Sequence, residues 1–298
     1  MLVAHLKQGR GSTACVAERG AARHGFVLSR GGWGRLMIPG VALEASPADF
    51  YDDLAEDYHL IFADWNATIA RQAEVITGLL RAEHGLLSGR VLDASCGIGT
   101  QALGLAAREF EVTASDISAV SVRRCAREAA SRGLSITTAV ADVRVLDVPN
   151  AGEFDVALSF DNALPHLLDD DALTTACVAL RRVLRPGGVL LASIRDYDAI
   201  VQQRPSGDPP RSFPTELGER ISFQVWDWLS QDRYTLRHFT MQSSGGDWAV
   251  LERRTAYRAL TRPVLSSALA AAGFKNIVWQ MPDQTGFYQP IVSAIANA

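Results

Sequence analysis

The fold of this chain is constrained most by residues 89–100, where a short apolar run ends in a glycine-rich turn (Gly-Arg-Val-Leu-Asp-Ala-Ser-Cys-Gly-Ile-Gly-Thr). Val91 and Leu92 are typical of the end of a buried parallel strand, and a helical pattern follows the turn. Gly97 and Gly99 allow the backbone of the turn to approach a ligand closely. Free N–H groups and the positive end of the helix then face the carboxyl edge of the strand. The stretch therefore predicts a nucleotide-binding geometry in an α/β fold.

Two further carboxylates follow the next two predicted strands. Asp116 ends the strand 112–115, 23 positions after Asp93, where an acidic side chain can accept both hydroxyls of a ribose. Asp142 follows the strand 136–140, where it can cap an adenine amino group. This series of acidic residues at three successive strand ends resembles the class I S-adenosylmethionine-dependent methyltransferases.

A dinucleotide-dependent dehydrogenase is the competing interpretation of the glycine-rich turn. Its fingerprint is Gly-x-Gly-x-x-Gly, and the alanine variant of that fingerprint would allow Ala102 at the third position. Asp93 before the turn and Asp142 after the third strand have no role in dinucleotide binding. The resemblance to methyltransferases is therefore favoured.

The composition excludes several other classes of protein. The chain has 298 residues, of which 48% are hydrophobic and 21% charged, which suits one large α/β core with an addition. A net charge of −4 argues against the broad basic face of a nucleic-acid-binding protein. The four cysteines lack metal-ligand spacing, which predicts a reduced, cytoplasmic protein without a metal site. No apolar run reaches the ~18–20 residues of a membrane span, so no membrane partner is expected.

The first 45 residues are rich in Gly, Arg and Ala and have no periodic apolar face. They predict a disordered or loosely attached tail. The alternative is an arm that reaches over a partner subunit, which would make the protein a homo-oligomer.

Ordered structure is expected to begin at Ser46. This residue is typical of a helix N-cap, and the proline after it is typical of the first helical position. The following segment is unusually aromatic. Its amphipathic side chains are Tyr51, Tyr58, His59 and Trp65. They suit a lid whose rings pack over a cofactor while their polar ends remain free to form hydrogen bonds.

A helix over residues 67–83 carries Arg71, and here the resemblance narrows. The spacing from Arg71 to Asp93 and then to Asp116 is similar to that of glycine N-methyltransferase and the glycine/sarcosine methyltransferases. The resemblance implies that Arg71 binds the methionine carboxylate of S-adenosylmethionine. Ser95 stands where the commonest class I pattern has its first glycine, and this family tolerates a small residue there.

The loop after the fourth strand, residues 161–167, resembles the family's Gly-Asn-x-x-x-His loop. The resemblance implies that Asn162 contacts the substrate amine region and that His166 lies against the cofactor. Asp161 replaces the family's glycine and brings extra negative charge near the methyl donor. After the fifth strand, Arg195-Asp-Tyr-Asp is similar to the family's Arg-Asn-Tyr-Asp, whose arginine binds the substrate carboxylate through two hydrogen bonds.

The remaining sequence completes a doubly wound, seven-stranded, mostly parallel sheet with a Rossmann-like methyltransferase fold. A proline-rich loop over residues 204–214 precedes three alternating strands at 221–229, 234–241 and 249–257. We expect a helical lid over residues 46–88, and an antiparallel insertion over about 204–260 that covers the active site. Residues 46–298 are thus predicted to form one methyltransferase domain.

The predicted function is methyl transfer from S-adenosylmethionine to a small-molecule acceptor, favouring a nitrogen of an amine or an amino-acid-like substrate. The alternatives are C- or N-methylation of an aromatic, indole-like metabolite and a cofactor-binding protein without methyl transfer. The predicted proton acceptors are Tyr58, His59 and His166. The predicted cofactor-binding residues are Tyr58, Trp65, Arg71, Asp93, Ser95, Gly97, Gly99, Asp116, Ile117, Asp142, Val143, Phe160 and His166. The predicted substrate-binding residues are Tyr51, Asn162, Arg195 and Tyr197.

Overall fold

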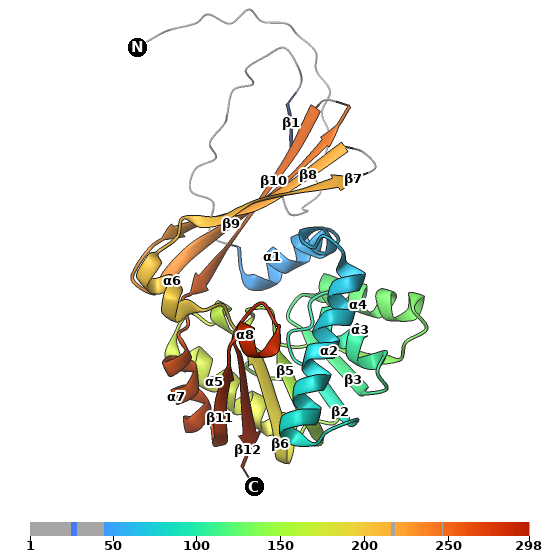
Figure 1. Cartoon of the computed structure of the whole chain (residues 1–298), viewed down its shortest axis with the longest axis vertical. Coiled ribbons are helices and arrows are strands. Elements are labelled where there is room, and N and C mark those ends of the chain that lie inside the picture. Colours follow the sequence, from blue (N-terminus) through green and yellow to red (C-terminus); the bar gives the residue numbers. More distant parts are fainter. Residues whose placement is uncertain (1–24, 29–44, 216–217, 246, 298) are drawn as a thin grey trace, which may run out of the picture.

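The computed structural model describes residues 25–28, 45–215, 218–245 and 247–297. Two sheets dominate it, and the antiparallel sheet lies above the carboxyl edge of the seven-stranded sheet (Figure 1). The strands of the larger sheet are, in spatial order, β11 (Phe274–Gln280), β12 (Ile291–Ala296), β6 (Leu184–Ser193), β5 (Phe154–Ser159), β2 (Arg90–Asp93), β3 (Glu111–Asp116) and β4 (Ile136–Val140). The predicted doubly wound sheet is confirmed.

Strands β2 to β6 are parallel to one another, whereas β12 is antiparallel to both β6 and β11. The parallel strands therefore end at one edge of the sheet, so residues distant in sequence meet there. The helices of this part are α2 (Trp65–His84), α3 (Thr100–Ala106), α4 (Ala119–Ser131), α5 (Asp170–Val183) and α7 (Arg262–Ala271).

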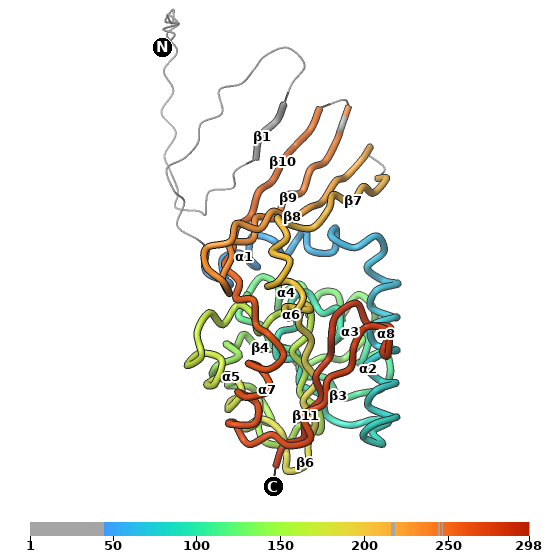
Figure 2. The backbone as a smooth tube through the Cα atoms, turned by 60° about the vertical axis from the view of Figure 1, so that its left-hand side comes forward, coloured from blue at the N-terminus to red at the C-terminus, as the bar shows by residue number. Residues whose placement is uncertain are grey.

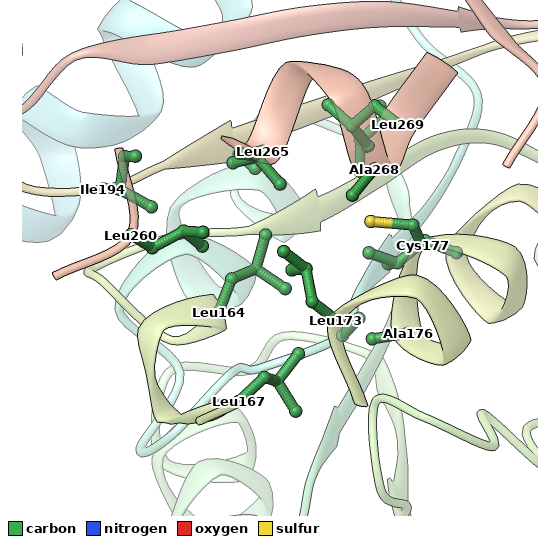
Figure 3. Packing of buried hydrophobic residues seen from close by; sticks show 14 of the residues in the cluster. Leu164, Leu167, Leu173, Ala176, Cys177, Ile194, Leu260, Leu265, Ala268 and Leu269 are labelled. Atoms are coloured by element: carbon green, nitrogen blue, oxygen red, sulfur yellow. The ribbon is translucent and has the colours of Figure 1, made fainter. Parts of the chain in front are cut away.

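The core between α5, α7 and the sheet fixes the loop that follows β5. Leu173 of α5 and Leu265 of α7 are fully buried in one apolar cluster. Leu164, in the short helix η2 (Leu164–His166), packs into the same cluster (Figure 3). Because this leucine is buried, the η2 loop has a fixed position at the carboxyl edge of the sheet.

The predicted lid consists of α1 (Pro47–Leu54), the short helix η1 (Tyr58–Ile61) and α2. The Ser46 hydroxyl accepts the N–H of Asp49 at 3.2 Å, so the predicted N-cap is confirmed. Phe50 and Leu54 are buried, which attaches α1 to the core. Figure 2 shows α1 between the antiparallel sheet and the seven-stranded sheet.

The antiparallel sheet is larger than predicted. Its strands are, in spatial order, β1 (Gly25–Leu28), β10 (Asp247–Arg258), β9 (Arg233–Ser244), β8 (Gly218–Trp228) and β7 (Gly207–Thr215). The three predicted strands correspond to β8, β9 and β10. The short helix α6 (Tyr197–Gln203) lies between β6 and β7 and so connects the two sheets. The short helix α8 (Pro282–Thr285) lies between β11 and β12.

The prediction of a proline-rich loop is wrong. The proline-rich segment 204–214 is largely the edge strand β7, whose register shifts between Asp208 and Arg211, around its two adjacent prolines. Proline is tolerated in an edge strand and at a bulge because no ladder hydrogen bond from its nitrogen is needed there. Residues 25–28 of the predicted tail form β1, which pairs with part of β10 on the side that β9 leaves without a partner. The rest of the predicted tail, up to residue 44, lies outside the described residues.

Candidate functional site

A cleft of about 400 Å³ opens at the carboxyl edge of the parallel strands. The turn after β2, the ends of β3 and β5, and the segment after β4 form its floor, and α1 covers it. The predicted cofactor-binding residues that line the cleft are Tyr58, Ser95, Gly97, Asp116, Ile117, Asp142, Val143, Phe160 and His166.

The turn after β2 is attached to the end of β3 by Asp116. One carboxylate oxygen of Asp116 accepts the N–H of Gly97 at 2.9 Å, and the other accepts the N–H of Ser118 at 2.9 Å. Burial raises the pKa of Asp116, and the hydrogen bonds from Ser118 and Gly97 oppose this rise. Each oxygen retains acceptor capacity for a ligand hydroxyl.

The two glycines of the turn differ in what surrounds them. Both have positive φ, 52° at Gly97 and 100° at Gly99. A Cβ at Gly97 would meet no atom within 4 Å, so open space lies in front of this part of the turn. A Cβ at Gly99 would lie 2.8 Å from Sγ of Cys125, so Gly99 allows α4 to pack against the turn. Gly99 does not line the cleft.

Two of the predicted acidic residues have partners or positions that the sequence did not indicate. Asp142 lines the cleft with its carboxylate paired to Arg144 at 2.5 Å, and this guanidinium lowers the pKa of Asp142. Asp93 is fully buried beneath the turn, and burial raises its pKa to about 8. Asp93 therefore supports the turn from behind and is not among the residues that line the cleft.

The lid contacts the η2 loop through a buried group of aromatic side chains. The Tyr51 hydroxyl lies 3.0 Å from Nε2 of His166 and 3.2 Å from the hydroxyl of Tyr257. The rings of His166 and Tyr257 lie 4.1 Å apart between centroids. Burial lowers the pKa of His166 to about 3, which makes the imidazole neutral near neutral pH. A neutral His166 suits hydrogen bonding better than proton uptake.

A second cavity, of about 520 Å³, lies beneath the antiparallel sheet and shares Tyr51, Tyr58 and Asp161 with the cofactor cleft. Arg71 of α2 and Arg195 after β6 line it. Because these three residues belong to both linings, the two spaces adjoin each other.

Arg195 is held in this cavity mostly by neutral groups. Its guanidinium donates to the hydroxyl of Tyr234 at 3.0 Å and to Oε1 of Gln224 at 2.9 Å. It lies 4.7 Å above the ring of Trp226, and the nearest carboxylate oxygen that pairs with it, of Asp208, is 4.0 Å away. The cation is therefore positioned and only weakly neutralised.

The carboxylates next to Arg195 in sequence pair elsewhere. Asp196 and Asp198 lie 3.0 Å and 3.3 Å from the guanidinium of Arg262. They therefore hold α6 against the start of α7, and their ion pairs are with Arg262 rather than with Arg195.

Asn162 connects the loop after β5 to the residues after β6. Its Oδ1 accepts the backbone N–H of Arg195 at 3.1 Å, and its Nδ2 donates to the Tyr197 hydroxyl at 3.0 Å. Asn162 lines the cavity, whereas Tyr197 is fully buried behind it. Tyr197 therefore positions Asn162 and lies outside the lining of the cavity.

Three further predicted residues lie away from the cofactor cleft. Trp65 is buried and donates from Nε1 to Oγ1 of Thr100 at 2.9 Å, which fixes the start of α2 against α3. Arg71 lines the second cavity, and His59 lines neither space. Burial lowers the pKa of His59.

Several lining residues were not predicted from the sequence. Trp226, Gln224 and Tyr257 come from the antiparallel sheet, and Tyr288 precedes β12. The alternation of aromatic residues in β8 gives a weak signal for Trp226. Nothing in the sequence indicates that Tyr288 reaches the cavity, because its position depends on how β12 inserts beside β6.

Within the described residues, no cluster of three His, Cys, Asp or Glu side chains could hold a metal ion. In the same part of the chain, every helix is too short or too polar to cross a membrane.

The residues of the cleft fit S-adenosylmethionine. Open space stands before the N–H-bearing turn at Gly97, a buried carboxylate at Asp116 can accept ribose hydroxyls, and Ile117 and Val143 offer apolar surfaces for a base. When bound, this cofactor supplies an electrophilic methyl group on a sulfonium.

Comparisons with known proteins agree with this geometry. Residues 91–188 match a family model described as a methyltransferase domain. The chain is 29% identical over 154 residues to a glycine/sarcosine N-methyltransferase of Parasynechococcus marenigrum, covering 52% of this chain and 53% of that one. It is 30% identical over 174 residues to the glycine N-methyltransferase of Rattus norvegicus, covering 54% and 58%. The chain thus spans a little over half the length of these curated relatives.

Solved structures share the fold at low sequence identity. A sugar N-methyltransferase from a Streptoalloteichus species matches with a TM-score of 0.68 at 16% identity, over 91% of this chain and 100% of that one. An S-adenosylmethionine-bound amino pentose methyltransferase from Micromonospora echinaspora matches with a TM-score of 0.66 at 17% identity, over 81% and 95%. The chain thus contains a methyltransferase domain over residues 91–188 and shares the fold of the class I S-adenosylmethionine-dependent methyltransferases, whose cofactor is S-adenosylmethionine.

Proposed function

We propose that this protein transfers the methyl group of S-adenosylmethionine to a nitrogen of a small amine or amino-acid-like acceptor. The observation that carries the proposal is Arg195, a guanidinium that lines the cavity beside the cofactor cleft and is held mostly by neutral side chains. Its planar pair of donors matches a carboxylate.

The two connected spaces supply what methyl transfer requires. The donor already carries a good leaving group, so the protein must mainly hold donor and acceptor in line at close distance. The lid and the antiparallel sheet border the cavity, and removal of a bound amine from part of its hydration there favours its unprotonated form. Of the three predicted proton acceptors, only Tyr58 lines both spaces; Tyr51 and Asp161 also line both. Burial raises the pKa of Tyr58.

The names of similar proteins support a nitrogen acceptor. The curated relatives are described as glycine or glycine/sarcosine N-methyltransferases, and one structural neighbour is described as a sugar N-methyltransferase. The acceptors in these names share only the nitrogen, so the names favour a nitrogen as the methylated atom. The rest of the acceptor is inferred from the residues that line the cavity.

An aromatic, indole-like acceptor is the second candidate. The aromatic lining of the cavity favours it, because Trp226, Tyr257 and Tyr58 offer flat apolar surfaces. For such an acceptor Arg195 would stack on the ring and bind no carboxylate.

Acceptor screening with isotopically labelled S-adenosylmethionine tests the proposal. Formation of S-adenosylhomocysteine together with a labelled N-methyl product is expected. Cofactor binding without any labelled product would indicate the remaining alternative, a cofactor-binding protein.

Arg195→Lys then distinguishes the two kinds of acceptor. Lysine keeps the charge but loses the planar pair of donors, so KM for a carboxylate-bearing acceptor should rise by about one to two orders of magnitude, as expected for a charged hydrogen bond of roughly 1.5–3 kcal/mol. Cofactor affinity should barely change. An unchanged KM for every carboxylate-bearing substrate that is turned over would contradict the amino-acid-like assignment, and a melting curve identifies a purely structural effect.

A further inference from the structure

Asp161 occupies the boundary between the cofactor cleft and the second cavity. It follows β5 directly and is one of the three residues that line both spaces, together with Tyr51 and Tyr58. It is the carboxylate of that junction. A charged group at this boundary lies where donor and acceptor must meet.

The backbone holds Asp161 in a conformation that a glycine would adopt more easily. Its φ is 54° and that of Asn162 is 70°. Asp and Asn are the side chains that tolerate this left-handed region best. The N–H of Asp161 donates to Oγ of Ser193 at 2.9 Å, and that hydroxyl donates to Gln289 at 2.9 Å. The end of β6 therefore fixes where the carboxylate points.

In the described part of the chain, the hydrogen-bond donors to the Asp161 carboxylate are neutral. Oδ2 accepts from Nε2 of Gln101 at 2.8 Å, and Oδ1 accepts from the hydroxyl of Tyr288 at 2.6 Å. Among the described residues, no Arg, Lys or His nitrogen lies within 4.0 Å of it. A carboxylate has about four lone-pair sites, so each oxygen can accept one more hydrogen bond.

The surroundings of this carboxylate suit a cation. Burial raises the pKa of Asp161, and the hydrogen bonds from Tyr288 and Gln101 oppose this rise. The aromatic rings of Tyr51, Tyr58 and Tyr288 line the same cavity, and rings attract ammonium groups through their faces. A half-buried carboxylate with only neutral donors attracts a cation to the same site.

We propose that Asp161 binds the nitrogen of the acceptor, in its ammonium form on arrival, and takes one proton from it. This proposal rests on the proposed function. The acceptor ammonium gives one proton to the carboxylate, which leaves a neutral amine and a carboxylic acid. The nitrogen lone pair then forms the N–CH₃ bond while the C–S bond breaks with its electron pair going to sulfur. The methylated ammonium leaves, and Asp161 returns its proton to water.

None of the other groups that face Asp161 in the described part of the chain is as well suited to accept a proton from the acceptor. They are Tyr58 of η1, Gln72 of α2, Asp93 of β2, Gln101 of α3 and Tyr288. Burial raises the pKa of both tyrosines, and Asp93 is fully buried.

The cofactor itself carries two positive groups that the carboxylate could bind instead, and affinities separate these cases. A carboxylate that binds the methionine ammonium would make Asp161→Asn weaken S-adenosylmethionine and S-adenosylhomocysteine equally. One that faces the sulfonium would weaken only S-adenosylmethionine. For a carboxylate that binds the acceptor, we expect both affinities to change by less than about threefold.

The experiment compares amines with hydroxyl analogues of the same shape. Calorimetry with the full chain, saturated with S-adenosylhomocysteine, would measure 2-phenylethylamine against 2-phenylethanol and glycine against glycolate. We expect the wild type to prefer at least one amine by about tenfold or more, and Asp161→Asn to reduce this preference to less than about threefold. Asp161→Glu should restore part of it, because it restores the charge.

Control variants separate binding from folding. Asp161→Gly should also lose the amine preference without loss of melting temperature, because glycine suits the positive φ. Asn150→Gly changes an exposed residue with a φ of 60° and should leave the preference unchanged. The proposal is overturned if no amine is preferred by the wild type, or if the preference persists in Asp161→Asn.

Turnover is a separate readout. An Asp161-dependent amine preference without methylated product would leave Asp161 as an ammonium-binding residue and would contradict the proposed function. Methylation that keeps the wild-type kcat in Asp161→Asn would contradict the proton transfer.

Discussion

At the scale of single residues, two glycines of one turn have separate roles. Gly97 faces open space in the cofactor cleft, and Gly99 faces the side chain of Cys125. A sequence motif presents them as a pair, but only Gly97 lines the cleft.

This separation predicts different consequences for the same substitution. Gly97→Ala should weaken S-adenosylmethionine binding by about tenfold with a modest loss of stability, because its Cβ would enter the space of the ligand and the positive φ costs about 1–2 kcal/mol. Gly99→Ala should lower the melting temperature more, since a Cβ would lie 2.8 Å from Cys125 Sγ. Calorimetry and melting curves on both variants check this. A larger loss of affinity in Gly99→Ala than in Gly97→Ala would reverse the two roles.

At the scale of elements, one arginine holds the lid to the antiparallel sheet. Arg253 of β10 is buried, and its guanidinium contacts Asp53 at 2.9 Å and Asp57 at 2.8 Å. These carboxylates lie at the end of α1 and just before η1. Arg253 therefore links the lid to the sheet through two ion pairs, in addition to the contact between the hydroxyls of Tyr51 and Tyr257.

Arg253→Met should destabilise the protein by roughly 1–3 kcal/mol, because charged hydrogen bonds are lost while the half-exposed carboxylates return to water. The matched control is Arg254→Met on the same strand. Arg254 is 45% exposed and pairs with Glu252, a surface arrangement worth about 0–1 kcal/mol. Denaturant unfolding measures both. Equal losses would show that the contact with the lid contributes nothing specific.

At the scale of the whole molecule, the buried histidines link stability to pH. Burial lowers the pKa of His166 to about 3 and that of His238 to about 4, and Arg253 acts on His238 in the same direction. In the unfolded chain both titrate near pH 6.5. The unfolded state therefore binds more protons below pH 6.5, so stability is present above that pH and is lost as the pH falls toward the folded-state values.

We predict that His238→Gln loses less stability than the wild type when the pH is lowered from 7 to about 4.5. Glutamine can keep a hydrogen bond to Ser222, whose hydroxyl lies 3.1 Å from Nε2 of His238. The difference should be about 2–3 kcal/mol, because the pH falls about two units below the unfolded-state value at about 1.4 kcal/mol per unit. Unfolding curves at the two pH values measure it, and identical losses in both proteins would exclude His238 as a source of the dependence.

Local patterns were sufficient to predict much of the larger sheet. The runs that became β2, β3 and β5 are short, mostly apolar and bounded by turn residues, and a parallel strand buried on both faces requires that composition. The cofactor cleft followed from them, because parallel strands end at one edge and carry their terminal residues there. The edge strand β7 was harder to predict. Burial constrains β7 little, so its prolines were interpreted as a loop.

The parallel strands, the glycine-rich turn and the acidic residues at the strand ends were predictable from local sequence, since each depends on neighbours within a few residues. The second cavity was not predictable in this way. Its lining comes from the lid, from the loops after β5 and β6, and from the antiparallel sheet, segments that are far apart in the chain. The tertiary structure also placed Asp161 between the two spaces, because the direction of its carboxylate depends on a left-handed backbone held by Ser193, 32 residues away.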